Sequence, residues 1–106
     1  MMIQFSANAL KTLQEALVHY GVNVQTDATI EECAELIVAL NKHVKRAPKV
    51  GLETLNNVID EMADVEIMLA QMRIAFEIDD STIQRQIELK LNKLKGYLCE
   101  TYKHMP

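Results

Sequence analysis

Glycine, proline, cysteine and aromatic residues are all scarce in this chain of 106 residues, which has three glycines, two prolines, two cysteines and no tryptophan. With so few helix breakers, and with 49% hydrophobic and 25% charged residues, the composition is typical of a helical protein of one domain. Cys33 and Cys99 form no Cys-x-x-Cys motif. We therefore expect two reduced thiols in or near the core rather than a disulfide.

The sequence also lacks a basic excess and a long hydrophobic run. Eleven Lys and Arg residues against 15 Asp and Glu residues give a formal net charge of −4. This balance argues against binding to duplex nucleic acid through a large positive surface. Because no segment has the character of a signal peptide or a membrane span, we expect no membrane partner and a cytoplasmic location.

Hydrophobic residues recur at helical spacing in four segments that are separated by turn residues. Ser6 is expected to cap the first helix, and Gly21 to end it. Residues 22–28 are predicted to be a loop, and either Asp27 or Thr29 is expected to cap the second helix; Thr29 also fits a capping box with Glu32. The four helices are expected at about residues 6–20, 29–46, 52–76 and 80–102. The predicted core stripe of the second helix consists of Ile30, Cys33, Ile37, Leu40 and Val44.

Short connections, such as the one containing Pro48 and Gly51, favour antiparallel neighbours, so we predict an all-α, four-helix bundle-like single domain over residues 1–106. The third helix is unusual because Ile67, Met68 and Ile74 make its second side apolar as well. A small bundle cannot easily bury one helix on every side. We therefore expect a homo-oligomer, a dimer or a tetramer, with this helix near the interface; coverage by a single chain is the alternative.

Two acidic motifs carry the most chemical information in the sequence. They are Glu31-Glu32-x-x-Glu35 in the second helix and Glu61-x-x-Asp64 in the third. The spacing of three places the two acids of each pair on one side of its helix. If the helices are neighbours, four carboxylates converge, and oxygen ligands of this kind suit Mg²⁺ or Mn²⁺. The alternative is a solvated acidic surface.

The paired motif resembles the EExxE and ExxD signature of the all-α nucleoside triphosphate pyrophosphohydrolases, the MazG-like proteins, over about residues 25–97. The resemblance implies an Mg²⁺-dependent enzyme of nucleotide-pool housekeeping that hydrolyses a (d)NTP to the monophosphate and pyrophosphate. It makes Glu32, Glu35, Glu61 and Asp64 the metal ligands. Glu31 would then be the accessory carboxylate that orients or deprotonates the attacking water.

The resemblance also implies phosphate contacts late in the fourth helix, where Lys90, Lys93 and Tyr97 lie along one flank. Gln25 lies just ahead of the first motif and is the candidate contact for the base, although a plain loop residue is the simpler interpretation. Gly96 stands where the resemblance leads us to expect an arginine. A non-catalytic helical oligomer with a relic or structural metal site is therefore the alternative function.

Overall fold

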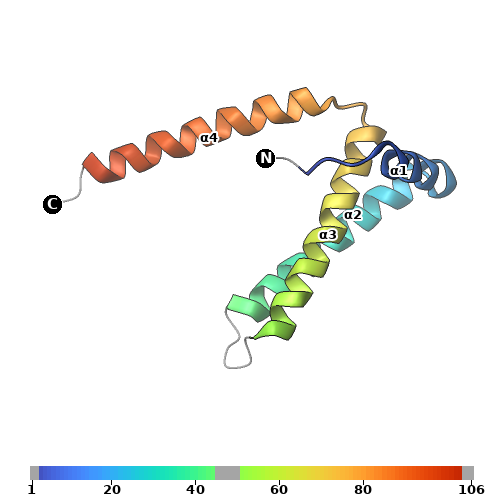
Figure 1. Ribbon diagram of the computed structural model, residues 1–106, viewed down its shortest axis with the longest axis horizontal. Coiled ribbons are helices and arrows are strands. Elements are labelled where there is room, and N and C mark those ends of the chain that lie inside the picture. Colours follow the sequence, from blue (N-terminus) through green and yellow to red (C-terminus); the bar gives the residue numbers. More distant parts are fainter. Residues whose placement is uncertain (1–2, 45–50, 104–106) are drawn as a thin grey trace. The chain divides into compact units, whose positions relative to one another are not determined.

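The computed structural model describes residues 3–44 and 51–103, and these residues form four α-helices (Figure 1). No strand occurs within these ranges, so the predicted all-α class is confirmed. Within the same ranges, no helix is both long and apolar enough to cross a membrane. The predicted end of the second helix near residue 46 and the turn at Pro48 lie outside the described residues. The helices are α1 (Ala7–Tyr20), α2 (Val22–Val44), α3 (Leu52–Ala75) and α4 (Asp80–Lys103).

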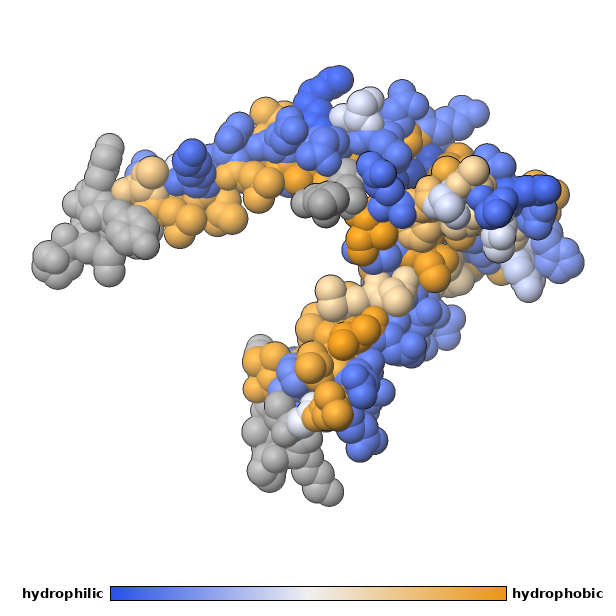
Figure 2. Space-filling view, viewed as in Figure 1, coloured by the Kyte–Doolittle hydropathy of each residue, from blue (hydrophilic) through white to orange (hydrophobic). Residues whose placement is uncertain are grey.

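The chain divides into two compact units, the first spanning residues 3–77 with α1, α2 and α3, and the second starting at residue 78 and containing α4. The positions of the two units relative to one another are not determined. Figure 2 shows hydrophobic side chains along one side of α4 and hydrophilic side chains along the other, as the sequence predicts for an amphipathic helix. A single domain over residues 1–106 stays a prediction.

Gly21 alone separates α1 from α2. Its N–H donates to the carbonyl oxygen of Leu17 at 2.9 Å, and its own carbonyl oxygen accepts the N–H of Gln25 at 3.1 Å. Its φ of 88° is one that side-chain-bearing residues rarely adopt, so glycine lets one helix end and the next begin at once. Residues 22–28 therefore belong to α2, and the predicted loop is wrong. Thr29 lies inside the helix and donates to the carbonyl oxygen of Gln25 at 2.8 Å, so the predicted capping box is wrong too.

The start of the first helix agrees with its prediction. The side-chain oxygen of Ser6 accepts the N–H of Ala9 at 3.1 Å, which is the expected N-cap. Leu13 and Leu17 are buried, and α1 contacts both of the helices that follow it.

Helices α2 and α3 form an antiparallel hairpin, and the contact between them is the largest in the first unit (Figure 1). Two polar pairs fix which residues face one another. Gln25 Nε2 donates to Gln71 Oε1 at 2.7 Å near one end, and His43 Nδ1 lies 2.9 Å from Thr54 Oγ1 near the other. Each step forward along α2 is therefore matched by a step back along α3.

The hydrophobic core of the described residues is thin, since no side chain there is less than 2% exposed. The predicted core stripe of α2 is wrong for four of its five residues: Cys33 is half-buried, but the others are 43–67% exposed. The reason is that α2 contacts α3 through small and polar residues, among them Gln25 and Ala39, so the larger apolar side chains lie beside the contact. The buried apolar residues are Leu13, Leu17, Ala39, Val58, Met68, Ala70 and Met72.

The hairpin consequently has a hydrophobic face, which we define as Ile37, Leu40, Val44, Leu55, Ile59 and Met62, each at least 41% exposed. Most of these residues directly follow a residue that contacts the other helix: Leu40 follows Ala39, Leu55 follows Thr54 and Ile59 follows Val58. We call the contacting positions of each helix its contact line. Because the two helices are antiparallel, the positions that directly follow the contact line of either helix lie on the same side of the hairpin. Figure 2 shows this hydrophobic surface along one flank of the hairpin. A continuous exposed apolar surface of this kind is typical of a protein interface.

Candidate metal centre

Carboxylates from α2 and α3 meet midway along the hairpin. Glu32 lies two turns beyond Gln25 on α2, and Asp64 lies two turns before Gln71 on α3, so the antiparallel register brings them opposite one another. Glu61 precedes Asp64 by one turn. Each of Glu32, Glu61 and Asp64 has a carboxylate oxygen within 4.8 Å of those of the other two. The structure thus brings together three of the four predicted ligands.

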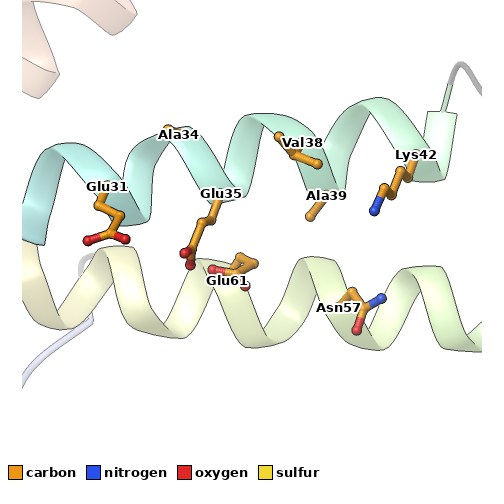
Figure 3. A pocket seen from close by; sticks show the side chains of 8 residues that line it. All are labelled: Glu31, Ala34, Glu35, Val38, Ala39, Lys42, Asn57 and Glu61. Atoms are coloured by element: carbon orange, nitrogen blue, oxygen red, sulfur yellow. The ribbon is translucent and has the colours of Figure 1, made fainter.

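Glu35, the fourth predicted ligand, lies at the outer edge of this cluster. Its side chain is exposed, yet its charge raises the pKa of both Glu32 and Glu61, so it lies close to them. Figure 3 shows Glu31 and Glu35 directed from α2 towards α3, where Glu61 lies opposite Glu35. Glu35 and Glu31 therefore lie next to the cluster of Glu32, Glu61 and Asp64.

Glu35 and Glu61 also line a groove of about 460 Å³ between α2 and α3. Its acidic end holds Glu31, Glu35 and Glu61, and its other end holds Lys42 and Asn57 (Figure 3). Ala34, Val38 and Ala39 complete its lining. The groove thus offers negative charge at one end and a lysine ammonium at the other.

Burial and like charge oppose ionisation of the inner carboxylates. Loss of water, reinforced by the charges of Glu35 and Asp64, raises the pKa of Glu32 from 4.5 to about 7. Loss of water and the same two neighbours also raise the pKa of Glu61. Both side chains are half-buried as a whole, but the Oε2 atom of each is out of contact with water and has no hydrogen-bond partner. A buried carboxylate oxygen without a partner is unfavourable, and this pair needs an explanation.

A hard cation fits these residues. The described cluster offers carboxylate oxygens and neither histidine nor cysteine, which is the donor set that Mg²⁺ and Mn²⁺ prefer. A cation would be coordinated by both unpartnered oxygens, and its charge would offset the repulsion among the acids. The alternative of a solvated acidic surface suits the exposed Glu31 and Glu35. It does not account for the buried oxygens of Glu32 and Glu61.

The other predicted site residues are placed as follows. Gln25 is only 8% exposed and is bonded to Gln71, so the expectation of a loop residue is wrong. Lys90, Lys93 and Tyr97 are exposed on α4 in the second unit, and their contact with a substrate stays a prediction.

Lys42 is a groove residue that sequence reasoning missed. It follows Glu35 by two helical turns, on the same side of α2. Extending the spacing of the acidic motif along the helix could have found it. Lysines of α4 were predicted instead, because the resemblance implies phosphate contacts late in that helix.

In comparisons with family models, curated proteins and solved structures, nothing matches this chain.

Proposed function

We propose that the protein is a magnesium-dependent nucleoside triphosphate pyrophosphohydrolase of the MazG-like type. The observation that carries the proposal is the pair of buried, unpartnered carboxylate oxygens on Glu32 and Glu61 within a cluster of acids. These acids are the ones that the EExxE and ExxD resemblance designates as ligands. The reaction adds water across the anhydride between the α- and β-phosphates and yields a nucleoside monophosphate and pyrophosphate.

In this proposal Glu32, Glu61 and Asp64 hold the Mg²⁺ ion, and Glu35 completes the ligand set from the edge of the groove. Bound Mg²⁺ would supply charge neutralisation for the phosphate oxygens. Glu31 is exposed and faces the same groove, so its carboxylate can accept the proton of the attacking water. Lys42 at the opposite end of the groove can bind a phosphate oxygen by a charge-assisted hydrogen bond.

The proposed activity is tested by product analysis. Purified protein with Mg²⁺ is expected to release pyrophosphate from at least one member of a panel of canonical and modified nucleoside triphosphates. Pyrophosphate and orthophosphate are measured separately, with chelator as the control. Release of orthophosphate alone, or of neither product across the panel, would contradict the proposal and favour the non-catalytic alternative.

We also propose that the protein is a homo-oligomer, because the hydrophobic face of the hairpin suits a second copy of the chain. The thin core supports this, since the described residues of the first unit, taken by themselves, leave much apolar surface exposed. Assembly is compatible with either the catalytic or the non-catalytic proposal.

Ile59→Glu is expected to weaken assembly, because it places an unpaired charge in the proposed interface. Ile59 is 55% exposed, so the substitution should leave the fold of the chain itself intact. Met68 is the wrong probe, since it is buried within the chain and its replacement would test folding instead. Light scattering measures the mass, and the exposed Val18→Glu on α1 is the matched control. A wild-type protein that is a stable monomer would overturn the oligomer proposal.

A further inference from the structure

Gln25 and Gln71 form a buried polar pair between α2 and α3. Their exposed fractions are 8% and 3%, and the 2.7 Å bond between Gln25 Nε2 and Gln71 Oε1 joins residues 46 positions apart. The neighbouring Thr26 hydroxyl lies 3.6 Å from Met72 Sδ and extends the polar contact by one position on each helix. Buried amides that satisfy each other are directional, so the bond holds only one alignment of the two helices.

The glutamine pair and the acidic cluster share one alignment. Gln25 precedes Glu32 by seven residues, and Gln71 follows Asp64 by seven, so both intervals are two turns on the contact side of the helix. A slide of α3 along α2 by one turn, about 5.4 Å, would move Asp64 and Glu61 past their partners on α2. Because the acids of each helix are three residues apart, the slide would leave one facing pair, Glu35 with Asp64 or Glu32 with Glu61, in place of the present cluster of three.

Besides the glutamine pair, only the pair of His43 and Thr54 near the connection is directional in the described contact, and the rest of that contact does little to prevent a slide at the end that holds the acids. The buried Ala39 and Val58 interact without directionality, so they tolerate other alignments. The carboxylates oppose the observed alignment when no cation is bound, because it brings like charges together. Single buried polar residues are known to select one register between paired helices, even where they lower stability.

We propose that Gln25 and Gln71 are positioning residues that hold the α2–α3 register in which the carboxylates can bind a cation. This inference rests on the proposed metal site, and it gives Gln25 a task other than contact with a base. In this role the pair touches neither substrate nor cation. The pair aligns α2 with α3. Its effect on the stability of the fold can be measured separately from this alignment.

The test replaces the pair by leucines of similar size. Gln25→Leu alone leaves the Gln71 amide buried without a partner, so the melting temperature should fall by about 4–8 °C. The double variant Gln25→Leu/Gln71→Leu removes both amides and is expected to melt at or above the wild-type temperature in chelator. Its Mg²⁺-dependent rise in melting temperature should nevertheless fall to less than half that of wild type. Gln14→Leu at an exposed position of α1 is the matched control.

A distance measurement reads the register without metal. Spin labels are placed at the exposed Asn23 of α2 and Asn56 of α3, after Cys33→Ala and Cys99→Ser, and the sample is diluted with unlabelled protein. These sites lie far apart along the hairpin, so a one-turn slide shifts their distance by about 5 Å. With the glutamines present we expect one narrow distance distribution. With the leucine pair we expect a second population or a clear broadening.

An unchanged distribution in the leucine variant overturns the proposal, whatever the metal response. A changed distribution with a full Mg²⁺ response overturns it as well, because the site would then not depend on the register. If wild type itself shows no Mg²⁺ response, the proposed metal site fails, and the distance measurement still decides whether the glutamines set the register.

Discussion

Replacing Glu32 by glutamine is expected to abolish magnesium-dependent pyrophosphate release while raising the melting temperature of the metal-free protein. Glutamine keeps the shape of the side chain and removes a charge that burial and three neighbouring acids disfavour. The amide can also donate a hydrogen bond to a neighbouring carboxylate. The gain in melting temperature should be on the order of 4 °C for a chain of this size.

The loss of activity should be far larger than the gain in stability. Even residues that only orient metal ligands change affinity or activity by about 10–100-fold, so removal of an anionic ligand should exceed 100-fold. Opposite effects on stability and on function mark a site that is strained for its task.

Melting curves in chelator and in Mg²⁺, together with pyrophosphate assays, measure the two effects of Glu32→Gln. Glu15→Gln on the exposed side of α1 is the matched control and should change neither quantity. If Glu32→Gln gains as much melting temperature from Mg²⁺ as wild type does, Glu32 is not a metal ligand.

The stability of the metal-free protein is expected to fall as the pH rises from about 4.5 to about 7. In the unfolded chain Glu32 loses its proton near its ordinary pKa of 4.5, whereas burial and like charge raise its folded pKa to about 7. Within this window the folded state binds more protons than the unfolded state, so each step up in pH favours unfolding. The raised pKa of Glu61 acts in the same direction. The contribution of these two groups is the reverse of ordinary acid denaturation.

Magnesium should reverse that trend. The cation binds the deprotonated carboxylates, so protons compete with it at low pH. The Mg²⁺-dependent rise in melting temperature should therefore be small near pH 5 and largest above about pH 7. Melting curves across this range, with and without Mg²⁺, measure both trends. Subtracting the curves of Glu32→Gln isolates the contribution of the site from that of the remaining acids.

Two results would contradict this account of the site. One is a metal-free difference between wild type and Glu32→Gln that stays constant from about pH 5 to about pH 8. The other is an equal Mg²⁺ response at both ends of that range.

The helices and the meeting of the acids could be predicted because both follow from local spacing. Acids three residues apart share a helix side, and neighbouring antiparallel helices bring two such sides together. The convergence of Glu32, Glu61 and Asp64 agrees with that reasoning. The metal and the reaction stay proposals.

The contact between α2 and α3 could not be predicted from hydrophobicity. Its contact line includes Gln25, Ala39 and the acids, while the larger apolar residues of α2 lie to one side. The start of α2 at Val22 could not be predicted from the sequence for a related reason. Residues 22–29 are rich in β-branched and short polar residues, whose helix propensity is low, and the tertiary contact of Gln25 with Gln71 overrides that preference.

The two polar pairs of the hairpin also imply an order of closure during folding. His43 and Thr54 are 11 positions apart, whereas Gln25 and Gln71 are 46 apart. Loop-closure entropy therefore favours contact first near the connection, with the acids meeting next and the glutamines last. Fraying should run the other way, beginning beyond the glutamines, where α2 follows Gly21. Gln25 and Gln71 thus stand between the open end of the hairpin and the acids, so that the repelling carboxylates separate only after the amides have parted.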